Sequence, residues 1–349
     1  MIVRLVLVGF GNVGSALARL IVSKQSETIE RYDLDLRVVA IATGTHGLAL
    51  DAEGLDLTRA LEIRQRAGDL SELAPGKVQT DIPSLLKEIE ADAVLESVPV
   101  NYGTGQPALS YLQAALERGM HAITANKGPV VHGYHALSEI AQANGSRFLF
   151  EATVMDGAPI FSTWREGLPG ARLMSFRGIL NSTTNYLLTE MEAGKSFESA
   201  LEEAQEIGVA ETDPSGDIDG WDAAVKVAAL ATVLMDTPLG IEEVERQGIG
   251  ELDAAEIRAA VEAGQRWKLI CSVWREENKV LGRVRPERVG PEDPLYHVRG
   301  TSSQITFSSD VLGDLTIMGT DPGPDTTAYG MFADLLNAVR AGWRTAAAV

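Results

Sequence analysis

The chain opens with the feature that most limits its fold, an apolar run that passes directly into closely spaced glycines, MIVRLVLVGFGNVG. Residues 2–8 are mostly β-branched residues and leucine, the pattern of a strand buried on both faces of a parallel sheet. Helical spacing of apolar residues follows in SALARLIV. The glycines therefore stand in the turn between a buried strand and a helix.

Each glycine of the spacing G-x-G-x-x-G has its own physical reason in such a turn. The first permits the tight turn, the second lets the backbone approach a pyrophosphate, and the third lets helix and strand pack closely. Phosphates would then lie on the N–H groups at the helix N-terminus. The alternative is a glycine-rich turn that only packs tightly. We interpret the turn as a dinucleotide site, and its candidate cofactor-binding residues are Gly9, Phe10, Gly11, Asn12, Val13 and Gly14.

Strand and helix patterns then alternate. Strands are predicted at residues 36–42, within 91–99, and at 121–125 and 147–154, with helices at 107–119 and 135–145. Regular alternation of this kind predicts parallel βαβ units and a doubly wound sheet.

From about residue 151 the alternation stops, and longer helices and scattered strands follow until a final helix at 327–342. The predicted fold is α/β, with a Rossmann-type doubly wound parallel sheet in residues 1–150 and 320–349. An inserted α+β domain for substrate binding and dimerisation is predicted in residues 151–319.

The end of the second strand, AIATGTHG, is where such folds choose their cofactor. An acid there would bind the ribose of NAD, but Asp33 and Asp35 lie at the wrong end of the strand. Thr43, Thr45 and His46 could contact a phosphate, although no arginine is adjacent. The pattern slightly favours NADP over NAD, with Thr43 as a candidate contact.

Two further candidates follow predicted strands, whose C-terminal ends face the ligand crevice in doubly wound sheets. Lys127 comes directly after the strand at 121–125, and Ser97 lies in the segment 91–99. Lysines are common in surface turns, so only its location makes Lys127 a candidate.

Composition excludes some classes of partner. A formal net charge of −19 argues against nucleic acid or an anionic membrane as a partner, and its simplest meaning is solubility. No apolar run reaches the roughly 18 residues of a membrane span, and no secretory leader is recognisable. The one cysteine, Cys271, allows no disulfide within the chain and is expected to be a packed core thiol, which suits a reducing, cytoplasmic setting.

The run ETDPSGDIDGWDAAVK gathers carboxylates ahead of one lysine, Lys226; they are Glu211, Asp213, Asp217, Asp219 and Asp222. The apolar helix that follows is predicted to take Asp217 or Asp219 as its N-cap. Helical spacing would place Asp219, Asp222 and Lys226 on one side of it.

Because this helix is almost entirely apolar beyond Lys226, it should be buried, and the lysine should be partly buried with it. A partly buried lysine beside carboxylates can bind an amino-acid zwitterion and move a proton. The alternative is an exposed helix start with capping acids and one salt bridge.

The sequence resembles homoserine dehydrogenases from residue 1 to about 340. The stretches that carry the resemblance are GFGNVGSALA, ITANKGPV, FEATVMDGAPI, GILNSTTNYLL and GVAETDPSGDIDGWDAAVK. Their order and spacing are more specific than any single motif.

The resemblance implies the reversible NAD(P)-dependent reduction of aspartate 4-semialdehyde to homoserine. It implies that Lys127 and Lys226 flank the reacting oxygen and move its proton, and that Asp222 binds the substrate and orients both it and Lys226. It assigns to the substrate and its pocket the residues Glu211 (for the ammonium group), Asp217, Asn181, Thr183 and Asn185.

The resemblance also implies a monovalent cation, usually sodium, on Glu151 and the backbone oxygens of Val154, Asp156 and Ala158; hard oxygen ligands suit such an ion. Glu151 could instead be a structural acid that accepts backbone N–H bonds. A homodimer through residues 151–319 is expected. Many family members carry a C-terminal ACT regulatory domain, which the segment after the last helix leaves no room for, so no feedback inhibition by threonine is expected.

Two other functions stay open at this point. A related dehydrogenase for another small amino or oxo acid would use the same lysines and carboxylates. A non-catalytic nucleotide-sensing protein would lack turnover with aspartate semialdehyde.

Overall fold

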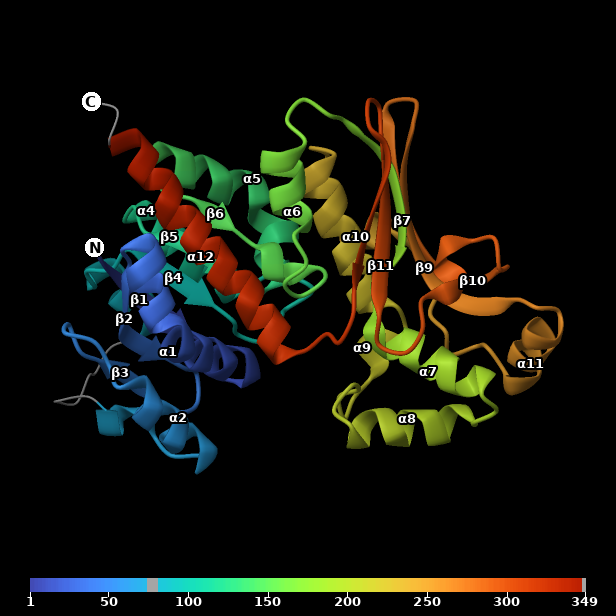
Figure 1. Ribbon diagram of the computed structural model, residues 1–349, viewed down its shortest axis with the longest axis horizontal. Coiled ribbons are helices and arrows are strands. Elements are labelled where there is room, and N and C mark those ends of the chain that lie inside the picture. Colours follow the sequence, from blue (N-terminus) through green and yellow to red (C-terminus); the bar gives the residue numbers. More distant parts are fainter. Residues whose placement is uncertain (74–80, 347–349) are drawn as a thin grey trace. The chain divides into compact units, whose positions relative to one another are not determined.

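The computed structural model describes residues 1–73 and 81–346. The chain forms two compact units: unit 1 covers Met1–Pro159 and Gly323–Val349, and unit 2 covers Ile160–Pro322 (Figure 1). The sequence analysis placed these divisions at about residues 150 and 320. None of the described helices is long and apolar enough to cross a membrane.

The sheet of unit 1 has the strand order β3-β2-β1-β4-β5-β6. All neighbours pair in parallel except β3, which is antiparallel to β2 at the edge. The strands are β1 (Ile2–Val8), β2 (Asp35–Ala42), β3 (Leu48–Leu50), β4 (Ala93–Glu96), β5 (His121–Thr124) and β6 (Phe148–Leu149). The chain leaves β1 toward β2 and returns on the other side of β1 as β4. The C-terminal ends of β1 and β4 therefore form the place where ligands bind in such sheets, and the predicted doubly wound sheet is confirmed.

Both faces of β1 are buried, as its apolar sequence predicts. Val3, Leu5 and Leu7 belong to a core cluster shared with helices α1 and α12, whereas Val6 and Val8 belong to another shared with α3 and α4. The helices of unit 1 are α1 (Asn12–Tyr32), α2 (Leu57–Gln65), α3 (Ile82–Glu88), α4 (Ala108–Glu117), α5 (Lys127–Ala143) and α12 (Pro324–Ala346), with short 3₁₀ turns η1 (Leu70–Leu73) and η2 (Glu151–Thr153).

The strand predicted at residues 147–154 is wrong over most of its length. Only Phe148 and Leu149 pair with β5, and the chain then turns into η2. The backbone N–H of Glu151 donates to the carboxylate of Asp334 on α12 at 2.7 Å, and the Thr153 hydroxyl donates to the Phe150 carbonyl at 2.7 Å. Because side chains satisfy these backbone groups, the segment leaves the sheet edge.

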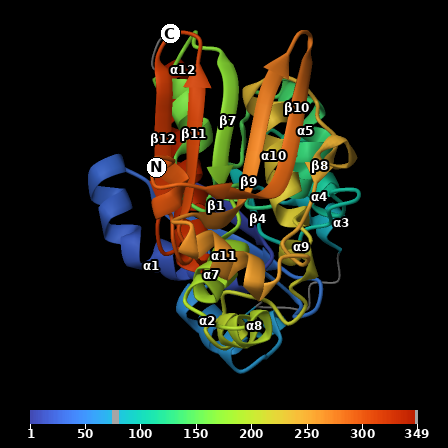
Figure 2. The same cartoon turned by 90° about the vertical axis from the view of Figure 1, so that its right-hand side faces the viewer.

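Unit 2 is built on a second sheet of order β12-β11-β7-β9-β10-β8, whose strands lie side by side in Figure 2. The pairs are antiparallel except that of β8 with β10. The strands are β7 (Leu173–Ile179), β8 (Glu245–Arg246), β9 (Arg266–Glu276), β10 (Lys279–Val289), β11 (Ser303–Ser309) and β12 (Gly313–Gly319). The helices are α6 (Ile160–Ser162), α7 (Ser182–Glu192), α8 (Phe197–Glu206), α9 (Ser215–Ile218), α10 (Trp221–Leu234) and α11 (Ala254–Glu262), with single turns η3 (Thr163–Gly167), η4 (Ile241–Glu243) and η5 (Pro294–His297).

The two faces of this sheet differ. Helix α10 packs on β9 and β10, and the side chains facing it are buried. On the other face, Ser175, Arg177, Trp274, Thr306 and Ser308 are only half-buried. They come from neighbouring strands at paired register positions, such as Thr306 opposite Arg177 and Ser175 opposite Trp274.

An aromatic cluster anchors the core of unit 2. The ring of Phe307, fully buried on β11, meets Trp164 edge to face at 5.6 Å and Phe176 at 6.1 Å between centroids. Aromatic pairs with this geometry contribute beyond the area they bury.

Phe307→Ala should therefore lower the free energy of unfolding by about 3–5 kcal/mol, because it opens a cavity between two rings. Met318→Ala, on the neighbouring strand β12 with Met318 52% exposed, is the control and should change little. Denaturant unfolding measures both, and equal small losses would contradict the aromatic cluster as the anchor of this core.

Candidate active site

The three glycines at the end of β1 have different structural reasons. Gly9 has φ +98°, and a Cβ there would lie 2.8 Å from the Ser97 backbone; a Cβ on Gly14 would lie 2.4 Å from the Gly9 carbonyl oxygen. A Cβ on Gly11 would meet nothing within 4 Å. The fold therefore requires Gly9 and Gly14, whereas the space beside Gly11 is open.

The helix that follows leaves room for an anion. Gly11 is the N-cap of α1, and no side chain caps the helix there. Of the residues in the turn, Phe10 is buried in the core and Val13 packs against it, whereas Asn12 is exposed. Phe10 and Val13 can therefore offer a ligand only their backbone.

The turn after β2 is held by its own side chains. The Thr43 hydroxyl donates to the Gly47 carbonyl at 3.0 Å and accepts the His46 N–H at 2.8 Å. Arg64 on α2, far away in sequence, brings a cation to the glycine turn, where its Nε donates to the Phe10 carbonyl at 3.0 Å. Sequence reasoning missed Arg64 because it considered only arginines adjacent to the strand end.

Lys127 and Ser97 stand at the ends of β5 and β4. Lys127 is the first residue of α5 and is half-buried, and Asn126 caps the helix by accepting the Gly128 N–H at 3.0 Å. The Ser97 hydroxyl donates to the Gly9 carbonyl at 3.4 Å. Unit 1 thus brings the candidate residues of three strand ends to the same edge of the sheet.

Unit 2 gathers a polar network at the start of α10. Lys226 Nζ donates to the Asp222 carboxylate at 2.7 Å and to the Leu180 carbonyl at 2.6 Å. The side chains of Lys226 and Asp222 are 13% and 12% exposed, so the expected partial burial of Lys226 is confirmed. Asn181, the N-cap of α7, donates from Nδ2 to Asp217 at 2.6 Å and to Asp222 at 3.0 Å.

Asp217 is held in an unusual electrostatic state. Burial raises the pKa of its carboxyl, and the nearby Asp222 charge raises it further. Hydrogen bonds from Asn181 and Thr183 and the charge of Lys226 act in the opposite direction. Thr183 also donates to the Val209 carbonyl at 3.0 Å, which ties α7 to the loop before α9.

Two predictions about the acidic run are wrong. The N-cap of α10 is Gly220, with φ +82°, and neither Asp217 nor Asp219 caps it. A separate turn, α9, contains Asp217 and has Asp219 as its C-cap, and Asp219 is exposed, whereas Asp222 is buried. The left-handed glycine reverses the chain between the two helices, which a continuous helical pattern cannot show.

Glu211 lies apart from this network. It is exposed in the loop after α8, and only its backbone carbonyl has a partner in the described chain, the Gln205 side chain at 3.0 Å. Asp213 likewise serves its own loop by accepting the Ser215 N–H at 3.1 Å.

The four residues expected to hold a cation follow β6. Glu151 is buried in η2, and Asp156 has φ +53° and accepts the Thr327 hydroxyl at 2.8 Å. No group of three or more His, Cys, Asp or Glu residues is placed to hold a metal ion among residues 1–73 and 81–346. A cation would therefore depend on backbone carbonyls such as those of Val154 and Ala158 with one carboxylate, a donor set that suits a hard monovalent ion better than a transition metal.

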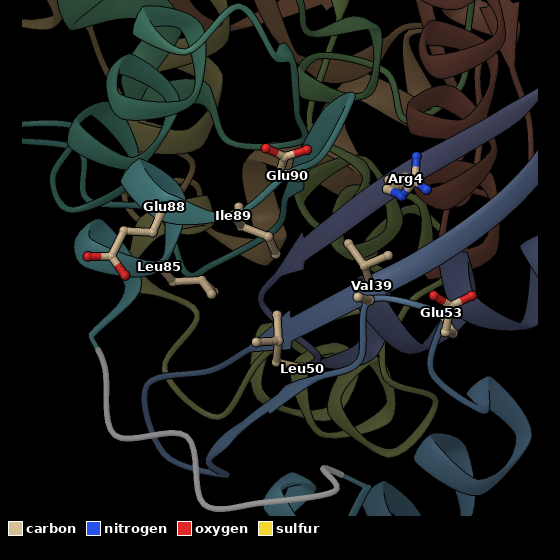
Figure 3. Close-up of a pocket in the computed structure, with 9 residues that line it drawn as sticks. Arg4, Val39, Leu50, Glu53, Leu85, Glu88, Ile89 and Glu90 are labelled. Carbon is tan, nitrogen blue, oxygen red and sulfur yellow. The ribbon is translucent and has the colours of Figure 1, made fainter.

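A hollow of about 640 Å³ lies elsewhere in unit 1 (Figure 3). Its apolar wall includes Val39 and Leu50, and its lining includes Arg4 and the acids Glu53 and Glu88. None of the candidate residues lines it, and Arg4 lies in the first half of β1, whereas the candidate residues follow the C-terminal ends of the strands.

Two family models match the chain in comparison with known proteins. The family model "Homoserine dehydrogenase" matches residues 159–336, and "Homoserine dehydrogenase, NAD binding domain" matches residues 9–151. The chain is 33% identical over 336 residues to an NAD(+)-dependent homoserine dehydrogenase of Pseudomonas canavaninivorans, covering 96% of this chain and 95% of that protein. It is 36% identical over 334 residues to a homoserine dehydrogenase of Methanocaldococcus jannaschii, covering 95% and 97%.

Solved structures show the same fold. A hyperthermophilic archaeal homoserine dehydrogenase in complex with NADPH superposes with a TM-score of 0.82 at 30% identity, covering 98% of each chain.

Gly11→Val should weaken NAD(P) binding by roughly tenfold or more, about 1.4 kcal/mol, because the side chain fills the space beside the helix N-terminus. The thermal midpoint should stay near that of the unchanged protein, since a Cβ at Gly11 meets nothing within 4 Å. Gly14→Ala is the contrasting variant and should lower the midpoint. Calorimetric titration with NAD(P) measures the affinity, and an unchanged value for Gly11→Val would mean that this glycine only packs.

Proposed function

The chain belongs to the homoserine dehydrogenase family, and from this we propose that Lys226 and Lys127 move the proton in its reaction, the NAD(P)-dependent interconversion of aspartate 4-semialdehyde and homoserine. The observation that carries the proposal is the fixed environment of Lys226 Nζ between Asp222 and the Leu180 carbonyl. These two hydrogen bonds fix the direction of Nζ, as transfer of a proton to one substrate atom requires.

The bound nicotinamide cofactor supplies or accepts the hydride, and the protein binds, orients and manages the proton. The glycine turn and the uncapped start of α1 suit the pyrophosphate, since a side chain at Gly11 would occupy that space. Ser97, Thr43 and the start of α5 lie at the neighbouring strand ends and are the further cofactor contacts of the proposal.

Lys226 acts as the general acid in the reductive direction, donating from Nζ to the oxygen that becomes the homoserine hydroxyl. In the oxidative direction the neutral amine accepts that proton. Asp222 orients the amine and opposes its deprotonation, because an adjacent negative charge favours the ammonium form. Asn181 holds Asp222 and Asp217 in place through one amide.

The carboxylates account for recognition of an amino acid. A substrate ammonium needs negatively charged or carbonyl oxygens, and Asp217 and Asp222 supply two half-buried or buried carboxylates a short distance from Lys226. Thr183 supports the same pocket. Glu211, on its exposed loop, is our proposal for the direct ammonium contact.

For the cofactor we propose a preference for NADP. The turn after β2 offers hydroxyls rather than a carboxylate, and the Arg64 guanidinium lies beside the glycine turn. A cation in this region favours the extra phosphate of NADP. A monovalent cation such as sodium is proposed on Glu151, Val154, Asp156 and Ala158, where it would brace the loop after β6.

A reducing, cytoplasmic location is also proposed. Cys271 is the one cysteine of the chain and is a free, fully buried thiol. Burial raises its pKa to about 12, so the thiol stays protonated and inert.

We also propose a homodimer through unit 2. The half-buried face of its sheet and the edge strand β12 are the surfaces that a second copy would cover. Trp274 lies on that face beside Arg283.

Lys226→Ala should lower kcat by roughly 10²-fold or more, as expected for loss of a general acid, while NAD(P) binding persists. Lys226→Arg keeps the charge beside Asp222 but holds its proton too tightly to transfer it, so it should be almost as slow. Lys279→Ala, which removes an exposed lysine of β10, is the control. Steady-state rates with homoserine decide the matter, and near-normal turnover of Lys226→Arg would reject Lys226 as the proton donor.

The dimer is expected at micromolar concentration by light scattering. Trp274→Glu should shift the mass to that of a monomer, because it places a charge in the covered face. Val261→Glu, at an exposed position of α11, should leave the mass unchanged. A monomeric unchanged protein would refute the assembly.

A further inference from the structure

Glu96 is a buried acid that the reaction described above does not use. It is the last residue of β4, next to the central strand, and its exposure is 0%. Within the described residues no lysine, arginine or histidine forms an ion pair with it. An unpaired acid at this depth is costly to ionise, so its presence calls for a reason.

The carboxylate closes a ring of hydrogen bonds. It accepts the Val98 N–H at 2.6 Å and the Thr124 hydroxyl at 2.5 Å. Thr124 in turn accepts the Asn126 N–H at 2.9 Å, and Asn126 donates back to the Val98 carbonyl at 3.3 Å. The ring thus joins the loop after β4 to the turn after β5.

Both joined segments carry candidate site residues. Ser97 lies between Glu96 and Val98, and its hydroxyl touches the carbonyl of Gly9 in the glycine turn. Lys127 follows Asn126, which caps α5 through the Gly128 N–H. A shift in the ring would therefore move Ser97, which contacts the glycine turn, and the backbone before Lys127 together.

We propose that Glu96 is a positioning residue: its ionised carboxylate holds the Ser97 loop and the Lys127 turn in one arrangement that binds cofactor well. The inference rests on the proposed role of these residues. The ionised carboxylate accepts the hydrogen bonds from Val98 and Thr124 as charge-assisted bonds, which are roughly twice as strong as those that a neutral carboxyl group accepts.

Glu96 changes charge close to neutral pH. Burial raises its pKa to about 7, against the hydrogen bonds from Thr124, Val98 and Asn126. Tyr111 on α4 faces the same region. Burial raises the pKa of its phenol, and the charges of Asp81 and then Glu96 raise it further. Lys127 is the cation at the adjoining turn.

Ionisation of Glu96 is proposed to strengthen cofactor binding, but it lowers the stability of the folded state. The folded state retains a proton that the unfolded chain has released between the ordinary value of 4.5 and about 7. The contribution of Glu96 to stability is therefore complete at low pH and is lost as the pH rises through this window. A structural acid would be expected to stabilise the working form, whereas this one destabilises it.

Glu96→Gln is the test, because glutamine keeps the shape of the side chain but has an acceptor oxygen at only one of its two terminal positions. NADPH affinity is measured by fluorescence titration from about pH 6 to about pH 8.5. This range spans the titration of Glu96, whose pKa is about 7. The ratio of wild-type to variant affinity should be near one at the acid end and reach roughly tenfold at the alkaline end. The thermal midpoint of Glu96→Gln relative to wild type should rise over the same range.

Thr124→Val and Thr124→Ser provide the second pair if Glu96→Gln fails to fold. Valine removes the hydroxyl and should weaken NADPH binding at alkaline pH, and serine restores it. An affinity ratio that does not change with pH, or equal binding by the two Thr124 variants, would overturn the proposal. Because binding needs no turnover, failure of the Lys226 test leaves this result interpretable by itself.

Discussion

Backbone groups left without partners where a strand passes into a helix are the constraint on which both units depend. After β1 the first N–H groups of α1 have no side-chain cap. After β5 and β7, Asn126 and Asn181 cap α5 and α7 with their side-chain oxygens. Each asparagine uses its remaining amide group to hold other polar residues, Asn126 the Val98 carbonyl and Asn181 two carboxylates. The side chain that caps the start of a helix therefore also positions polar groups of the candidate site in each unit.

Buried charge is the second theme. Lys226 and Asp222 compensate each other at the head of an apolar helix, and removing either partner would leave an uncompensated charge in the core. Glu96 has hydrogen-bond donors but no cation in the described chain, and its pKa of about 7 reflects that difference. The structure thus tolerates charge where it can orient a reacting group, at some loss of stability.

The sequence predicted what depends on local pattern. The first strand, the separate reasons for Gly9 and Gly14, the doubly wound sheet and the pairing of Asp222 with Lys226 follow from spacing, and the structure agrees. It failed where distant residues decide: Asp334 draws residues 151–153 out of the predicted strand, and Gly220 separates Asp219 from α10. Arg64 and the Glu96–Thr124 ring could not be found, because contacts between segments far apart in sequence leave no local signal.

The central claim is that a nicotinamide-dependent proton and hydride transfer on homoserine is carried out by this chain. Initial rates of homoserine oxidation with NAD⁺ and with NADP⁺, followed by the absorbance of the reduced nicotinamide, test it most directly. The account predicts turnover that depends on both homoserine and cofactor, with the higher kcat/KM for NADP⁺. A folded protein that binds either cofactor and yet oxidises no homoserine would contradict it.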